Sequence, residues 1–292
     1  MLNFHKLAHF LNEQKKSCIV ITEADLVILK QSLKAFGLQK KILQYPSIGH
    51  FAYDPTPPLT NNAAERIRTV QALKLDQPFC LLMSSLGWFE KRPILDDILQ
   101  PLFIEQDSMM THTHFMDILF LYGFERTNTV LYSGQFAVRG DRIDIFPPMT
   151  TYPVRVDFFG DTIEGIKTFD PITQKTISPT KKITIWPANE FLLGEKEISN
   201  YESNYKEQLS ITNQAIVSSI IDGQNKKNLG HLWPLFYTAS QHISEFYHGE
   251  PTIWIEPTIN LEKEWEDIQK GYTQSLGQGR FILPVEELYC FV

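Results

Sequence analysis

The sequence predicts an α/β protein in which a small, mostly antiparallel sheet interrupts a larger domain built on a parallel sheet. Short apolar runs alternate with helically spaced segments near the N-terminus, which is the pattern of a doubly wound layer. Between residues 133 and 187 the period changes to two, as expected of half-buried strands. With 292 residues the chain is long enough for two domains. We expect residues 1–108 and 196–292 to form two halves of one domain, and residues 109–195 to form the inserted domain.

The parallel-sheet domain is predicted from apolar runs that are flanked by helical periodicity. In the first half, the expected strands are Cys18–Thr22, Lys41–Tyr45 and Pro78–Ser84, and the expected helices are 4–14, Ala24–Phe36 and Ala63–Leu73. In the second half, a helix or helix pair is expected over Ser199–Ile221 and a further helix over Ile259–Gln274. Two apolar runs, 233–237 and 251–257, are expected to be strands that return to the first sheet.

The inserted sheet is predicted from alternation. Gln135, Ala137 and Arg139 alternate with Phe136 and Val138, and the same pattern continues to the Pro147-Pro148 pair, which cannot donate ladder hydrogen bonds. In the next strand, Val154, Val156 and Phe158 face one side, while Arg155, Asp157 and Phe159 face the other. Gly160-Asp161 predicts a turn into the strand Thr162–Phe169, which gives an antiparallel hairpin. A further strand is expected at Ile183–Trp186, and a helix ending near Gly123 is expected before the sheet.

Composition excludes several classes of protein. Apolar content of 43% and charged content of 21% are ordinary for a globular protein, and a net charge of −7 disfavours an autonomous nucleic-acid binder. The acidic balance fits a protein that meets a protein partner, and equally one that is simply kept soluble. No window approaches the 18 apolar residues of a membrane span, and no signal peptide is present. We therefore expect a cytoplasmic protein, a monomer by default, without contact to a membrane.

Neither a metal nor a cofactor is expected. The three cysteines form no CxxC pair and lie in or beside apolar runs, which predicts buried thiols in a reducing compartment. His112 and His114 could chelate a metal by their spacing, but no third ligand lies near them in the sequence. A phosphate loop needs a G-x-x-x-x-G-K-[ST] turn, whereas the first predicted strand is followed by Thr22-Glu23-Ala24-Asp25, with two carboxylates that would repel phosphate. We expect no ATP hydrolysis by this chain.

The strongest candidate for a functional site lies on the inserted sheet. By alternation, Arg155 and Phe159 share one face of their strand, and Arg139 is expected to share that face on the neighbouring strand. Arginine and aromatic side chains are enriched among interaction hot spots, so this set predicts a protein-recognition patch. The alternative is that each arginine pairs with a local carboxylate and that Phe159 belongs to the core. Arg142 and Lys167 are candidate charges at the rim of the patch. The local carboxylates that could pair with the arginines are Asp141, Asp157 and Asp161.

Beyond these patterns, the segments SGQFAVRGDRIDIFPP and YPVRVDFFGDTIEGIKTFDPITQKT resemble the second domain of bacterial transcription-repair coupling factors (Mfd) and, more distantly, that of the excision-repair helicase UvrB. Outside them, FAYDPTPPLTNNAAERIRTVQAL (51–73), PANEF (187–191) and ILPVEELY (282–289) resemble the coupling factor rather than UvrB. The resemblance covers nearly the whole chain and is weak at residues 1–45 and 195–280.

This resemblance implies a degenerate RecA-like or Rossmann-like domain without ATPase motifs, interrupted by a UvrA-interaction domain. In the family this face docks on UvrA, and the matching positions are Arg139, Arg155 and the pair Phe158-Phe159. Arg142 departs from the family, which often has a small or apolar residue there. The implied function is a non-catalytic, UvrA-recruiting module of transcription-coupled nucleotide excision repair that mimics the UvrB surface.

The resemblance also bears on the other partners of the chain and on the alternative functions. RNA polymerase and DNA would be reached only through the remainder of a full-length protein, which carries a polymerase-binding domain and an ATP-driven translocase. If the chain is complete as printed, we expect its UvrA-binding face to be open and the chain to sequester UvrA. The alternatives are a nucleotide-dependent helicase or ATPase fragment, which the missing phosphate loop disfavours, and a DNA-binding repair module, which the charge disfavours.

Overall fold

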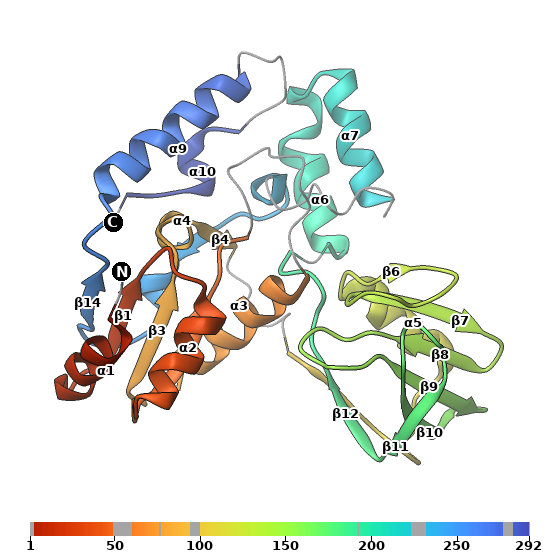
Figure 1. Ribbon diagram of the computed structural model, residues 1–292. Coiled ribbons are helices and arrows are strands. Elements are labelled where there is room, and N and C mark those ends of the chain that lie inside the picture. Colours follow the sequence, from red (N-terminus) through yellow and green to blue (C-terminus); the bar gives the residue numbers. More distant parts are fainter. Residues whose placement is uncertain are drawn as a thin grey trace. The chain divides into compact units, whose positions relative to one another are not determined.

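The computed structural model describes residues 3–48, 60–75, 77–93, 100–191, 193–222, 232–276 and 283–291. The chain divides into two compact units (Figure 1). Unit 1 comprises residues 1–58, 65–94 and 199–292, and unit 2 comprises residues 59–64 and 95–198. Within the described ranges, every helix is too short or too polar to cross a membrane.

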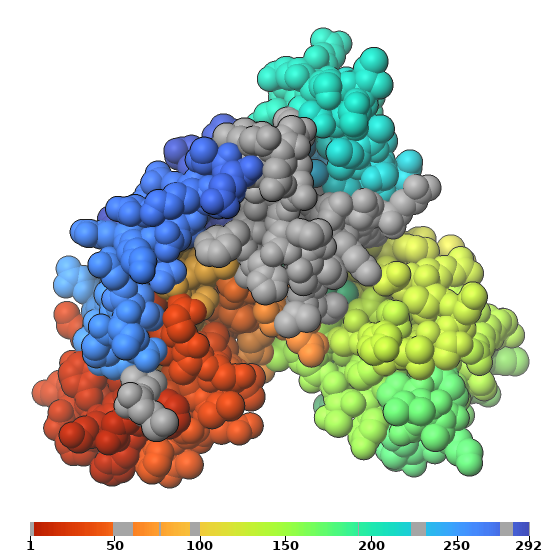
Figure 2. Space-filling view, turned by 45° about the horizontal axis from the view of Figure 1, so that its top comes forward, coloured from red at the N-terminus to blue at the C-terminus, as the bar shows by residue number. Residues whose placement is uncertain are grey.

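Unit 1 is built on a four-stranded parallel sheet with the order β14-β1-β3-β2. Its strands are β1 (Cys18–Ile21), β2 (Lys41–Tyr45), β3 (Phe79–Met83) and β14 (Thr252–Ile255). The partner of β1 on one side is therefore a strand from the far end of the chain. In Figure 2 the blue C-terminal segment accordingly lies against the red N-terminal segment. The prediction that residues 251–257 return to the first sheet is confirmed.

One face of this sheet is covered by α1 (Phe4–Glu13) and α2 (Leu26–Ala35), whose side chains form a single core cluster with the strands. Helix α1 begins where predicted, and α2 begins two residues later than predicted. Asn3 and Asp25 are their N-caps and accept hydrogen bonds from backbone amides of the first turns. Cys18 and Cys80 lie in this cluster, and burial raises the pKa of the Cys80 thiol to about 12. The prediction of buried thiols is confirmed for these two residues.

Among the remaining elements, the helices predicted at 63–73, 199–221 and 259–274 are present with shifted bounds, several short elements were not predicted, and one predicted strand is absent. The predicted strand at 233–237 is wrong, because the segment forms a 3₁₀ turn in which Pro234 occupies the first turn. Trp233, Leu235 and Phe236 are all buried, and a short apolar run of this kind does not distinguish a strand from a buried turn. The other elements that lie in unit 1 are α4 (Ser85–Phe89), β4 (Lys91–Pro93), η1 (Lys206–Gln208), α7 (Ile211–Ile221), η3 (Trp233–Leu235), β13 (Ser240–His242), η4 (Ile243–Phe246), α9 (Leu261–Leu276) and α10 (Val285–Leu288). Two helices have residues in both units: α3 (Thr60–Leu73) and α6 (Glu195–Asn204).

Unit 2 contains a six-stranded sheet with the order β11-β10-β9-β8-β7-β6, antiparallel except for the β6–β7 pair. The mostly antiparallel sheet predicted here is confirmed. The expected strand near 183–186 is present, but it pairs with an unpredicted strand in a separate two-stranded sheet. The strands of unit 2 are β5 (Leu102–Glu105), β6 (Glu125–Arg126), β7 (Gln135–Arg139), β8 (Arg142–Ile145), β9 (Val154–Phe159), β10 (Thr162–Phe169), β11 (Thr176–Thr180) and β12 (Lys182–Ile185).

One face of the six-stranded sheet packs against α5 (His112–Leu121), which Thr111 caps through its side chain. The ring of Phe115 lies 5.7 Å from that of Phe158, and the ring of Phe120 lies 5.1 Å from that of Phe136. Because side chains alternate along a strand, the face that α5 covers takes every second residue of β7, β8 and β9. The other residues of these strands are left for the opposite face.

Gly123 follows the C-cap of α5 and is poorly suited to replacement by a residue with a side chain. Its φ of +78° disfavours any side chain, and an added Cβ would lie 2.7 Å from the Cβ of Asn189. We expect Gly123→Ala to lower the free energy of unfolding by about 1–3 kcal/mol. Gly160→Ala is the control, because Gly160 also has a positive φ (+58°) but no atom within 4 Å of an added Cβ. Urea unfolding would measure both, and equal losses would show that the contact with Asn189 contributes nothing.

Candidate protein-interaction face

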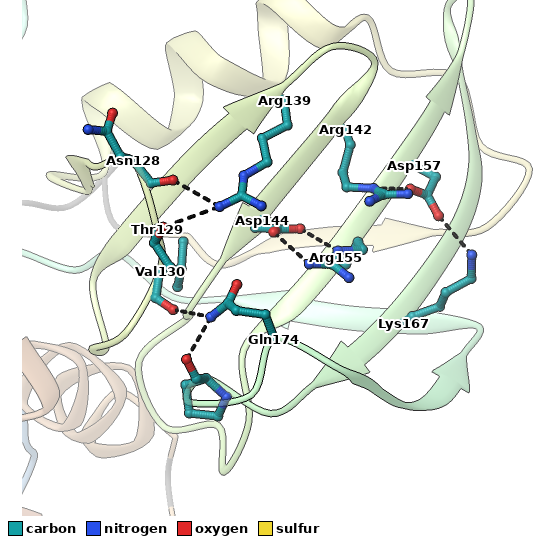
Figure 3. A network of polar contacts seen from close by, with 11 residues as sticks. Asn128, Thr129, Val130, Arg139, Arg142, Asp144, Arg155, Asp157, Lys167 and Gln174 are labelled. Carbon is teal, nitrogen blue, oxygen red and sulfur yellow. Dashed lines mark hydrogen bonds and ion pairs between the residues drawn. The ribbon is translucent and has the colours of Figure 1, made fainter.

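The strand register places charged side chains from four strands on the face opposite α5. Arg142 pairs in register with Asp157, and Asp144 pairs with Arg155, across β8 and β9. Directly opposed residues point to the same side of a sheet. We call this surface the charged face and define it by residues from β7 to β10, of which all but Phe159 are drawn in Figure 3: Arg139, Arg142, Asp144, Arg155, Asp157, Phe159, Lys167.

Asp157 is shared by two cations. Arg142 donates from Nε to Oδ1 at 2.8 Å, and Lys167 donates from Nζ to Oδ2 at 2.9 Å. Burial alone would raise the pKa of Asp157, but the hydrogen bonds from Lys167 and Arg142 outweigh it and hold the pKa below its usual value. The carboxylate is therefore ionised at neutral pH. Arg142 is exposed and Lys167 is half-buried, so both cationic side chains remain partly accessible at the surface.

Arg155 is much less accessible than the sequence suggested, because its carboxylate partner is Asp144. Nε donates to Oδ1 at 2.8 Å and Nη2 donates to Oδ2 at 2.9 Å, which is a bidentate pair. Hydrogen bonding to Asp144 raises the pKa of Arg155. Asp144 is 1% exposed and Arg155 is 9% exposed. Sequence reasoning missed Asp144, although its alternation with Ile143 and Ile145 could have placed it on the same face as Arg142.

Arg139 is exposed at the end of β7, and its recorded contacts are to uncharged groups. Its Nη2 donates to the backbone oxygen of Asn128 at 3.1 Å and to Oγ1 of Thr129 at 3.2 Å. These bonds fix one edge of the guanidinium against the loop that precedes β7, as Figure 3 shows. The alternative of a local carboxylate partner therefore does not hold for Arg139 among the described residues.

The two adjacent phenylalanines at the end of β9 separate onto opposite sides of the sheet. Phe159 is 77% exposed on the charged face, so the alternative that it belongs to the core is wrong. Phe158 is 5% exposed and contacts Phe115 and His112 of α5. Because of the alternation along the strand, Phe158 is not accessible on the charged face and is removed from the candidate set.

The charged face thus combines an exposed aromatic ring with an excess of cations. Its defining residues include four cations and two carboxylates, in a chain whose formal net charge is −7. Arginine and aromatic side chains are the groups most enriched at protein interfaces, and a local positive potential favours an acidic partner surface. Chemically, the arrangement suits protein recognition.

The carboxyl ends of the parallel strands in unit 1 are where an open α/β sheet usually binds its ligand. Here Oε2 of Glu256 accepts from Oγ1 of Thr22 at 2.6 Å and from the amide of Glu23 at 3.3 Å. Oε1 of Glu23 accepts from the amide and the hydroxyl of Ser85 at 3.0 and 2.6 Å. Carboxylates of the chain itself therefore take hydrogen bonds that a bound phosphate could otherwise accept. Across the described part of the chain, no three His, Cys, Asp or Glu residues are grouped to hold a metal.

The structure is that of an α/β protein in which a mostly antiparallel sheet carries the charged face. Residues 102–191 match the family described as the UvrB interaction domain. They cover most of unit 2 and every residue of the charged face.

Over most of its length the chain is similar to transcription-repair-coupling factors. It is 25% identical over 280 residues to that of Rickettsia bellii, covering 92% of this chain and 25% of the relative. It is 23% identical over 296 residues to that of Myxococcus xanthus, covering 91% of this chain and 24% of the relative. It is also 36% identical over 88 residues to UvrABC system protein B of Kosmotoga olearia, covering 30% of this chain and 13% of that protein. The resemblance predicted from the sequence is confirmed, and the chain spans about a quarter of the length of these coupling factors.

Proposed function

We propose that this chain is a non-catalytic module that recruits UvrA in transcription-coupled nucleotide excision repair, by presenting a surface like that of UvrB. The observation that carries the proposal is the charged face itself. It lies within residues 102–191, the segment that matches the UvrB interaction domain, and it exposes Phe159 on β9 and Arg139 on β7, two strands that β8 separates. The similarity to both coupling factors and UvrABC system protein B supports a shared partner.

The proposal includes the wider setting of the chain. The parallel sheet of unit 1 would be a degenerate RecA-like layer that does not bind ATP, which the carboxylates of Glu23 and Glu256 at its carboxyl edge support. RNA polymerase and DNA would be engaged only through other parts of a full-length coupling factor. The chain would act as a cytoplasmic monomer. Binding of a fluorescent ATP analogue would favour the alternative, an ATPase or helicase fragment.

The direct test is a calorimetric titration of purified UvrA with the wild-type chain and with Arg139→Ala. We expect saturable binding of the wild type. Removing a guanidinium that is hydrogen-bonded across an interface costs about 2–5 kcal/mol, so the variant should bind at least tenfold more weakly. Circular dichroism would check that the variant is folded. Absence of wild-type binding would refute the proposed function.

A further inference from the structure

The Asp144–Arg155 pair is built more rigidly than the other ion pairs of the charged face. Both residues lie on central strands of the sheet, opposite each other in register, and both are buried. The guanidinium carbon of Arg155 lies 4.7 Å from the centre of the Phe169 ring, which is fully buried. A bidentate bond and a ring contact together fix the position and the plane of the guanidinium.

Strand β7, which neighbours β8, places a small side chain beside the Asp144–Arg155 pair. Ala137 lies opposite Asp144 in the β7–β8 register, and it packs in a small cluster with Val130 and Phe169. The loop that carries Val130 is itself held by Gln174, whose Nε2 donates to the Val130 oxygen at 3.2 Å, as Figure 3 shows. The buried pair is therefore enclosed by small or apolar groups, which limits its freedom to rearrange.

One edge of the Arg155 guanidinium remains available. Nε and Nη2 are bonded to Asp144, whereas Nη1 has no hydrogen-bond partner among the described residues. The Arg155 side chain is 11% exposed, so water or a partner reaches only a small part of it. Arg155 therefore offers a recessed donor on the charged face, in contrast to the projecting side chains of Arg139 and Phe159.

We propose that Asp144 is a positioning residue for partner binding: it holds the Arg155 guanidinium so that Nη1 is a fixed donor at the floor of the charged face. This inference rests on the proposed function, because the partner is UvrA. An acceptor of UvrA, a carboxylate or a carbonyl oxygen, must then reach down to Arg155. Asp144 is itself too buried to touch UvrA, so any effect of its removal on affinity acts through Arg155.

A charge-swapped variant separates this role from a purely structural one. Asp144→Arg combined with Arg155→Asp restores an ion pair but moves the guanidinium from β9 to β8. We expect the double variant to melt at a higher temperature than Arg155→Asp alone, yet to bind UvrA at least about 30-fold more weakly than the wild type. Wild-type affinity in the swapped variant would show that UvrA binding needs the ion pair but does not depend on which strand carries the guanidinium.

A second pair of variants covers the case in which the swap does not fold. We expect Asp144→Asn to weaken UvrA binding about tenfold or more, and to add no further loss when combined with Arg155→Ala, since both act on one donor. Val156→Ala is the control: it removes buried volume from β9 on the face toward α5, and should lower stability without changing affinity. Additive losses, or wild-type affinity for Asp144→Asn, would overturn the inference. Failure of the wild type to bind UvrA would instead refute the proposed function, and this inference with it.

Discussion

Phe159→Ala should weaken the binding of UvrA by about 2–4 kcal/mol, which is a loss of about 30-fold or more in affinity. The ring is 77% exposed in the free chain, so its burial against a partner would remove a large apolar surface from water. It belongs to the same charged face as four cations that would attract an acidic partner, so the apolar and electrostatic contributions would act together. The measurement is a calorimetric titration of UvrA.

Phe103→Ala is the matched control for this prediction. Phe103 lies in the same unit, on β5, and is 72% exposed, but it is not part of the charged face. Its removal should change the affinity by less than about 0.5 kcal/mol, as for interface-remote surface positions. If the two substitutions weaken binding equally, the charged face is not the site of contact.

Glu90→Gln is expected to lower the stability of unit 1 by about 3 kcal/mol or more, the cost of removing one charge from a buried pair. Oε2 of Glu90 lies 2.5 Å from Nη1 of Arg66, and the two residues are 3% and 0% exposed. Glu90 also accepts from the amide of Ile48 at 3.0 Å, a bond that glutamine can still accept. The loss of stability therefore measures the removal of the Glu90 charge rather than the loss of the hydrogen bond to the backbone.

The control removes the second charge as well. Arg66→Met combined with Glu90→Gln removes the charge of both members of the pair, so it should recover part of the stability lost in Glu90→Gln alone. Four of the five tryptophans fall in the sequence ranges of unit 1, so tryptophan fluorescence during urea unfolding reports mainly on this unit. If the double variant is less stable than Glu90→Gln, the pair is stabilising in itself and the expectation is wrong.

Local patterns in the sequence were sufficient to predict most elements. The period of two placed Arg155 and Phe159 on one side of β9 and Phe158 on the other, and the Gly160-Asp161 turn gave the β9–β10 hairpin. Helical spacing placed α1 and α2 within two residues of their observed ends. These features depend on neighbours in sequence, so the sequence predicts them well.

Features that depend on strand register or on distant residues could not be predicted. The sequence named Asp141, Asp157 and Asp161 as partners for the arginines, whereas the β8–β9 register brings Asp144 to Arg155. The connection between these strands sets that register, and a shift by one residue would have turned Asp144 to the other side. Likewise, β5 and β12 pair across nearly the whole inserted segment, which no local pattern reveals.

The outer strands of the six-stranded sheet have a consequence for how a partner can approach. One edge is β6, which has two residues, and the other is β11, where Pro179 cannot donate a ladder hydrogen bond and the register shifts beside Phe169. Neither edge is a good template for adding a further strand. Under the proposed function, a partner would therefore contact side chains on the sheet's surface. Selectivity among partners would then depend on the chemistry of those side chains rather than on backbone pairing, which almost any extended peptide could satisfy.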